Sequence, residues 1–134
     1  MRALDDRTFV AGQIAPGDLA GIAAAGIALV VNNRPDGEEP GQPSGAEIEA
    51  AARAAGIAYR HIPIAGGFNA DDVIGMVQAL DEADGPALAF CRSGTRSTYL
   101  WAMARSEQGE PADELAAKAA SAGYDLAPIR AYLG

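Results

Sequence analysis

The sequence feature that most constrains the fold of this chain is the alternation of short apolar runs with alanine-rich stretches that carry helix caps. Runs rich in branched apolar residues indicate buried strands, and the capped stretches indicate helices between them. Strands are expected at residues 8–10, 27–32, 57–64 and 87–91, and helices at 16–26, 44–55, 69–83, 97–108 and 112–123, with a last short helix at the end. This order predicts a single three-layer α/β domain over residues 1–134, with a mostly parallel sheet of about four or five strands and helices on both faces.

Two helix starts and one strand have the clearest local signals. Ser44 followed by Glu47 forms a capping box, and Gly56 marks the end of the same helix. Asn69 is a suitable cap for the next helix. The continuous apolar run Ala87–Cys91 is typical of a strand buried on both faces, which places it at the centre of the sheet.

Composition limits the expected partners and location. The formal net charge of -8 argues against binding to nucleic acid or to an anionic membrane, and no apolar stretch approaches the roughly 20 residues needed to cross a bilayer. The single cysteine cannot form an internal disulfide, and the first ten residues are charged rather than signal-like, so a reducing cytoplasm is expected. Against this acidic background, Arg92 and Arg96 concentrate positive charge, which indicates a small anionic substrate.

The segment Cys91–Ser97 is expected to carry the chemistry, because it follows the expected central strand and leads into a helix. A thiolate at Cys91 gains from the helix N-terminus and from nearby guanidinium groups, which favours a catalytic nucleophile. Gly94 lets backbone N–H groups turn toward one point, and Arg96 is expected to act in catalysis by binding two oxygens of an anion. Ser97 is expected to donate a hydrogen bond to the sulfur as a third catalytic group. The remaining loop residues are expected to bind the substrate; they are Arg92, Ser93, Gly94 and Thr95.

A charged segment after the strand at 27–32 adds further candidates. Arg34 is a possible anion contact, and Asp36 or Glu38 is a possible acid, because the segment follows a strand that ends at the same edge of the sheet. The alternative is an ordinary solvated turn, since Pro35–Gly37 is a turn-forming sequence. The only histidine, His61, is expected to be structural, and the sequence predicts neither a metal nor a cofactor.

The loop Cys91–Ser97 resembles the active loop of single-domain rhodaneses, whereas nearly the whole chain resembles the phosphatase-like domain of the beta-lactamase-hydrolase-like proteins. The matching segments are residues 12–14, 32–38, 61–64, 91–97 and 122–126. The resemblance implies a fold related to dual-specificity tyrosine phosphatases. It also implies a link to persulfide metabolism, because the domain occurs fused to metallo-hydrolases of that metabolism.

Three departures from the tyrosine-phosphatase pattern bear on the reaction. Phe90 replaces the histidine that precedes the nucleophile in those enzymes. Arg96 comes five positions after Cys91 instead of six, so the loop is one residue shorter. The stretch Ala65–Gly67 stands where dual-specificity phosphatases usually carry the acidic residue that protonates the leaving alcohol.

These departures favour sulfane-sulfur transfer, through a persulfide on Cys91, to an external thiol partner. A general acid contributes about 10²–10⁴ in rate for a leaving alkoxide, whereas a thiolate or sulfite leaves without a proton. The alternative is hydrolysis of phosphate monoesters through a phospho-cysteine, with Asp36, Asp71 or Asp72 as a substitute acid. A non-catalytic anion-binding module is a third hypothesis, and the sequence makes no prediction of the oligomeric state.

Overall fold

Five strands form one sheet in the computed structural model, which describes all 134 residues. The strands are β1 (Arg2–Ala3), β2 (Thr8–Ala11), β3 (Leu29–Asn32), β4 (Ala58–His61) and β5 (Ala87–Phe90). Their order across the sheet is β1-β2-β5-β3-β4. Every pair is parallel except the antiparallel pair of β1 with β2, so the predicted mostly parallel sheet is confirmed.

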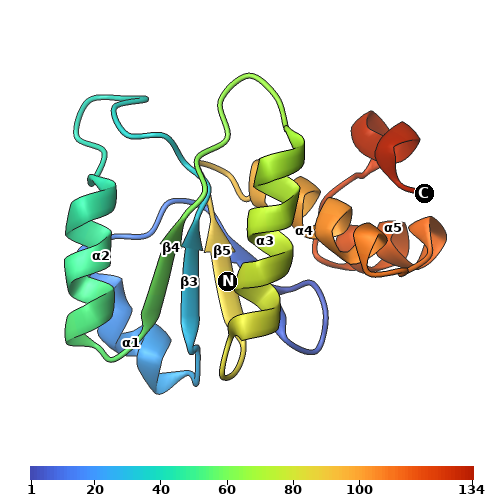
Figure 1. Cartoon of the computed structure of the whole chain (residues 1–134). Helices are drawn as coiled ribbons and strands as arrows, with labels where there is room; N and C mark the ends of the chain where they lie inside the picture. Colours follow the sequence, from blue (N-terminus) through green and yellow to red (C-terminus); the bar gives the residue numbers. More distant parts are fainter.

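Helices cover both faces of this sheet, as the sequence predicts (Figure 1). They are η1 (Pro16–Asp18), α1 (Leu19–Ala24), α2 (Gly45–Ala54), α3 (Ala70–Glu82), α4 (Thr95–Glu107), α5 (Ala112–Ser121) and η2 (Ala127–Tyr132), where η denotes a 3-10 helix. Figure 1 shows α1 and α2 on one side of the strands and α3, α4 and α5 on the other. None of these helices combines the length and the apolar character needed to span a bilayer.

The alternating side chains of β5 divide the core between these two layers. Ala87 and Ala89 belong to the cluster under α3, α4 and α5, whereas Leu88 and Phe90 belong to the cluster under α1 and α2. All four side chains are buried. This burial on both faces explains why the strand has a continuous apolar sequence rather than an alternating one.

The ends of several elements differ from the predicted ones. The strand predicted at 57–64 is shorter and ends at His61, although the N–H groups of Ile62 and Ile64 still donate to the carbonyls of Asn32 and Asn33. The predicted first helix is divided into η1 and α1. β1 has only two residues, too few to form a recognisable pattern. The capping box of Ser44 with Glu47 and the left-handed Gly56, with φ of 78°, are as predicted.

A carboxylate in the turn between β1 and β2 ties the edge of the sheet to α4. Asp5 Oδ2 accepts hydrogen bonds from Trp101 Nε1 at 2.8 Å and from Arg105 Nε at 3.1 Å. Trp101 is fully buried, so its indole N–H depends on this acceptor. The contact joins residues 96 positions apart and fixes α4 against the hairpin.

We expect Asp5→Ala to lower the free energy of unfolding by about 1–3 kcal/mol, because it leaves the indole N–H of Trp101 without an acceptor. Urea denaturation measures this change. Asp6→Ala is the matched control, since the exposed Asp6 makes none of the side-chain hydrogen bonds of its neighbour, and it is expected to change stability by less than about 0.5 kcal/mol. Equal effects of the two substitutions would contradict the assignment.

Candidate active site

Cys91 directly follows β5, the middle strand of the sheet. Both neighbours of β5 run parallel to it, so three strands end at the edge where the cysteine lies. Its side chain is fully buried, and its Sγ accepts a hydrogen bond from the backbone N–H of Gly94 at 3.2 Å. Gly94 has φ of 90° and caps α4, a conformation that glycine adopts without strain. The sharp turn therefore directs an N–H group at the start of α4 onto the sulfur.

Arg96 lies in the first turn of α4 and uses both terminal nitrogens to hold a carboxylate. Its Nη1 donates to Glu38 Oε2 at 2.7 Å, and its Nη2 donates to Glu38 Oε1 at 2.9 Å. Nη1 also donates to the carbonyl oxygen of Ile64 at 2.9 Å. The hydrogen bond to Glu38 raises the pKa of Arg96; burial opposes this rise, and the neighbouring Cys91 adds to it when ionised. The guanidinium is thus a fixed positive charge beside the sulfur.

Glu38 lies between two arginines. Besides its contacts with Arg96, its Oε1 accepts a hydrogen bond from Arg34 Nε at 2.8 Å. The hydrogen bond from Arg96 lowers the pKa of Glu38 to about 2; burial opposes this shift, and the hydrogen bond from Arg34 adds to it. Glu38 is therefore a carboxylate, and not a carboxylic acid, over the whole physiological pH range.

Arg34 has a different role from the direct anion contact that the sequence leads us to expect. Its side chain is only 1% exposed. Besides Glu38, its guanidinium donates to Gln13 Oε1 at 3.0 Å and to Glu39 Oε1 at 2.9 Å. These protein acceptors occupy the guanidinium, so Arg34 holds Glu38 beside Arg96 and Glu39 near Arg92 instead of facing a substrate.

The exposed rim of the loop carries the residues predicted to bind a substrate. The side chain of Arg92 is 70% exposed, and its nearest carboxylate, Glu39, lies 3.9 Å away. The Ser93 hydroxyl donates to Thr95 Oγ1 at 3.0 Å, and the Thr95 N–H donates to Ser93 Oγ at 3.4 Å. Arg92 is thus the loop cation with the greatest freedom to meet an anion, and the binding role of these residues stays a prediction.

Ser97 is buried in α4, but its hydroxyl does not donate to the sulfur as predicted. It donates to Asn33 Oδ1 at 2.7 Å instead. Asn33, which the sequence analysis missed, also donates from Nδ2 to the carbonyl of Ile62 and from its backbone N–H to the carbonyl of Phe90. Ser97 therefore belongs to a buried polar contact that joins α4 to the ends of β3, β4 and β5.

Asp36, the predicted possible acid, has a structural partner. Its Oδ1 accepts a hydrogen bond at 2.7 Å from the backbone N–H of Gly45, the first residue of α2. A carboxylate is favoured at this position by the positive end of the helix dipole. The structure thus gives Asp36 the role of a helix cap.

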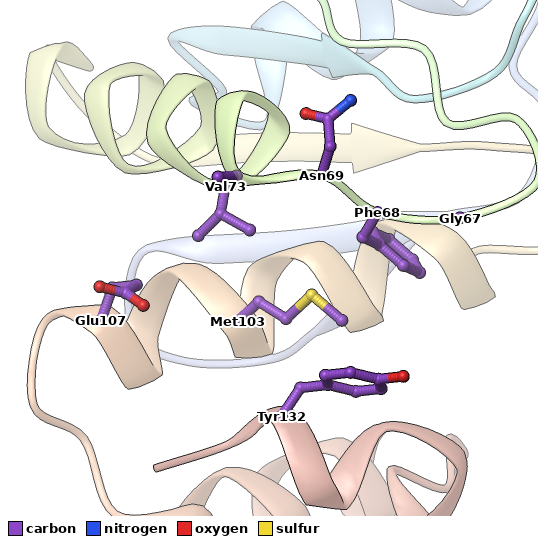
Figure 2. Close-up of a pocket in the computed structure, with 8 residues that line it drawn as sticks. Gly67, Phe68, Asn69, Val73, Met103, Glu107 and Tyr132 are labelled. Carbon is purple, nitrogen blue, oxygen red and sulfur yellow. The ribbon is translucent and has the colours of Figure 1, made fainter.

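A separate pocket of about 390 Å³ lies beside the loop that follows β4 and opens between α3, α4 and the C-terminal segment (Figure 2). Eight residues line it: Gly67, Phe68, Asn69, Ala70, Val73, Met103, Glu107 and Tyr132. The cysteine loop contributes none of them. The reactive groups therefore lie at the end of β5 and not in this pocket.

The chain is similar to known proteins of a phosphatase-like family. The profile of the family described as "Beta-lactamase hydrolase-like protein, phosphatase-like domain" matches residues 1–110. A beta-lactamase hydrolase-like protein of Agrobacterium fabrum is 37% identical over 107 residues, which are 79% of this chain and 25% of that protein. A protein of the same name from Xylella fastidiosa is 34% identical over 125 residues, which are 92% of this chain and 29% of that protein. The chain thus spans less than a third of the length of these relatives.

Solved structures give the same fold. A candidate phosphatase from Neisseria meningitidis, whose crystal structure is known, is 35% identical in sequence and has a TM-score of 0.86. The match covers 98% of this chain and 94% of that chain. The structure of Tk-PTP in its active form is 18% identical, with a TM-score of 0.77 over 98% of this chain and 91% of that one, and so supports the fold alone.

Fold, cysteine loop and sequence similarity together support a cysteine-dependent enzyme of the phosphatase-like class. The chain belongs to the family of phosphatase-like domains of beta-lactamase hydrolase-like proteins.

Proposed function

We propose that the protein transfers sulfane sulfur through a persulfide on Cys91. The observation that carries this proposal is the state of the carboxylates near the cysteine loop. Glu38 is ionised, with a pKa of about 2, and both of its oxygens are bound to arginines. The Asp36 carboxylate accepts a hydrogen bond from the Gly45 N–H at the start of α2. The Asp72 carboxylate accepts one from the backbone N–H of Asn69 at the start of α3. These three carboxylates are thus held by protein donors. Asp71, the remaining candidate acid, is exposed in the first turn of α3.

This arrangement suits substrates whose leaving group departs as a stable anion. An alkoxide leaving a phosphate ester depends on a general acid, which contributes about 10²–10⁴ in rate. A thiolate leaving a persulfide, or sulfite leaving thiosulfate, needs no proton. Without a placed general acid, a sulfurtransferase therefore loses little rate, whereas an alkyl phosphatase loses much.

The proposed reaction has two displacement steps. The Cys91 thiolate attacks the outer sulfur of a donor persulfide; a bond forms between the two sulfurs, the donor S–S bond breaks, and its electron pair leaves with the donor thiolate. An external thiolate then attacks the outer sulfur of the Cys91 persulfide, takes that sulfur, and releases Cys91 as a thiolate. The acceptor is external because the chain has one cysteine. The Gly94 N–H and the Arg96 guanidinium stabilise the negative charge on Cys91 Sγ before the first step and after the second.

Hydrolysis of phosphate monoesters is the second candidate. It is supported by the match to a phosphatase-like family and by the likeness to the candidate phosphatase from Neisseria meningitidis. In this reaction Cys91 attacks phosphorus, the ester oxygen leaves, and water releases phosphate from the cysteine. Aryl esters suit this site better than alkyl esters, because a phenolate leaves with less help from an acid.

We expect the protein to transfer sulfur from thiosulfate or glutathione persulfide to a thiol acceptor, and Cys91→Ser to abolish this turnover, because the hydroxyl cannot form a persulfide. A colorimetric assay of the persulfide formed measures it. Aryl-phosphate hydrolysis is assayed in parallel on the same two proteins. Cys91-dependent phosphate release without sulfur transfer would establish the second candidate instead. If the protein shows neither activity, the remaining hypothesis is a non-catalytic anion-binding module.

Arg96→Ala is expected to lower the turnover number about 10²–10³-fold, the usual effect of removing one donor that stabilises a reacting anion. Arg53→Ala is the matched control, because it also removes an arginine paired with a glutamate, but on the exposed face of α2. The control is expected to keep wild-type turnover. Wild-type turnover in Arg96→Ala would exclude Arg96 from the chemistry.

Glu38→Gln tests the ionised state of Glu38 through acid unfolding. The pKa of Glu38 is lowered to about 2 from the ordinary 4.5, so its pairing stabilises the folded protein above pH 4.5, and this contribution is lost as the pH falls toward 2. We expect wild-type stability to fall more steeply than that of Glu38→Gln between pH 4.5 and 2, as measured by urea denaturation. Glu49→Gln, which changes an exposed helix pair, is expected to follow the wild type. Equal slopes for the wild type and Glu38→Gln would rule out the lowered pKa.

A further inference from the structure

A tyrosine from the C-terminal part of the chain contacts the back of the cysteine loop. Tyr124 follows α5 and lies outside residues 1–110, which the family profile matches. Its hydroxyl donates a hydrogen bond to the backbone carbonyl of Ser93 at 2.9 Å. The two residues are 31 positions apart, so this contact forms only when the C-terminal segment packs against the loop.

The Ser93 carbonyl belongs to the same peptide group as the N–H that holds the sulfur. The N–H of Gly94 donates to Cys91 Sγ at 3.2 Å, and the carbonyl of Ser93 lies on the opposite side of that peptide bond, which is trans. A donor that fixes the carbonyl on one side therefore fixes the direction of the N–H on the other. The result is one chain of hydrogen bonds from the Tyr124 hydroxyl to Cys91 Sγ.

Packing holds the tyrosine in this place. A Cβ atom added to Gly94 would lie 2.2 Å from Tyr124 Oη and 3.0 Å from its Cζ, so the tip of the phenol fills the space that a side chain would need. Glycine is therefore favoured at position 94 for two reasons: the space for a Cβ atom is filled by Tyr124, and the backbone φ of 90° is strained for other residues. The absent side chain lets the phenol contact the peptide that faces the sulfur.

The phenol is a dependable donor at neutral pH. Burial raises the pKa of Tyr124, the charge of Arg2 opposes this rise, and the negative charge of the Cys91 thiolate adds to it. Hydrogen bonds in a chain also polarise one another, so a carbonyl that accepts a bond makes its peptide N–H a stronger donor. The Tyr124 hydroxyl therefore strengthens as well as directs the contact of Gly94 with the sulfur.

We propose that Tyr124 is a positioning residue, which holds the Ser93–Gly94 peptide with its N–H on Cys91 Sγ and so stabilises the reactive thiolate. This inference rests on the nucleophilic role of Cys91 in the proposed function, but not on whether sulfur or a phosphoryl group is transferred. Two titratable side chains interact with the charge of an ionised Cys91: Arg96 from α4, with Glu38 behind it, and Tyr124, which lies across the Ser93–Gly94 peptide from the sulfur.

The test is the rate at which iodoacetamide alkylates the protein as a function of pH. Cys91 is the only cysteine, so alkylation occurs at one sulfur and needs no turnover. Because this sulfur is buried, the absolute rate also reflects access, whereas the midpoint of the pH profile reports ionisation of the thiol. Tyr124→Phe keeps the ring and removes the donor, and we expect it to lower the alkylation rate near pH 7 about threefold to tenfold, the usual range for the loss of one hydrogen bond near a charge. Tyr132→Phe is the matched control, because Tyr132 is 74% exposed and lies away from the loop.

Thermal unfolding of both variants separates a positioning role from a purely structural one. A slower alkylation of folded Tyr124→Phe, with Tyr132→Phe unchanged, supports the proposal. A lower melting temperature for Tyr124→Phe with a wild-type alkylation profile would overturn it, as would equal changes in the two variants. Failure of the proposed sulfur transfer would leave this result unaffected, because alkylation of Cys91 requires neither a sulfur donor nor a phosphate ester.

Discussion

The pairing of β5 on both sides fixes the position of the reactive sulfur. Residues Ala87–Phe90 form parallel ladders with β2 and with β3, and the strand is buried by helices on both faces. The backbone at Phe90 has little freedom, because its carbonyl accepts the N–H of Asn33 beyond the ladder. Cys91 is the first residue beyond the strand, and the three residues Arg92–Gly94, with their left-handed turn at Gly94, separate it from α4. A rigid sheet thus presents a short loop whose geometry depends on a few contacts.

Those contacts give the sulfur a positive surrounding within an acidic protein. The first turn of α4 directs the Gly94 N–H onto the sulfur and carries Arg96, but Glu38 holds both terminal nitrogens of Arg96. An incoming anion must share this guanidinium with a carboxylate that stays ionised. The positive charge available to a substrate is consequently smaller than the two loop arginines suggest.

Local patterns were enough to predict the layers, but not the contacts across them. The apolar run Ala87–Cys91 and the capping box at Ser44 are local signals, and the structure contains both features they indicate. The pairing of Glu38 with Arg96 spans 58 positions, and the contact of Ser97 with Asn33 spans 64, so neither leaves a local signal. Charge and position made Arg34 a candidate anion contact, because a sequence shows a charge without showing its partners. A polar residue directly after a buried strand, as at Asn33, was the one signal that could have indicated a buried hydrogen bond.

The most direct measurement is the mass of the covalent adduct on Cys91. The protein is incubated with thiosulfate and an aryl phosphate together, quenched in acid, and examined as an intact chain by mass spectrometry, with Cys91→Ser as the control. We predict a gain of one sulfur atom at Cys91, which a thiol acceptor removes and which the control lacks. A phosphoryl group on Cys91 would contradict the proposal that Cys91 transfers sulfane sulfur. The absence of an adduct with any sulfur donor would contradict it as well.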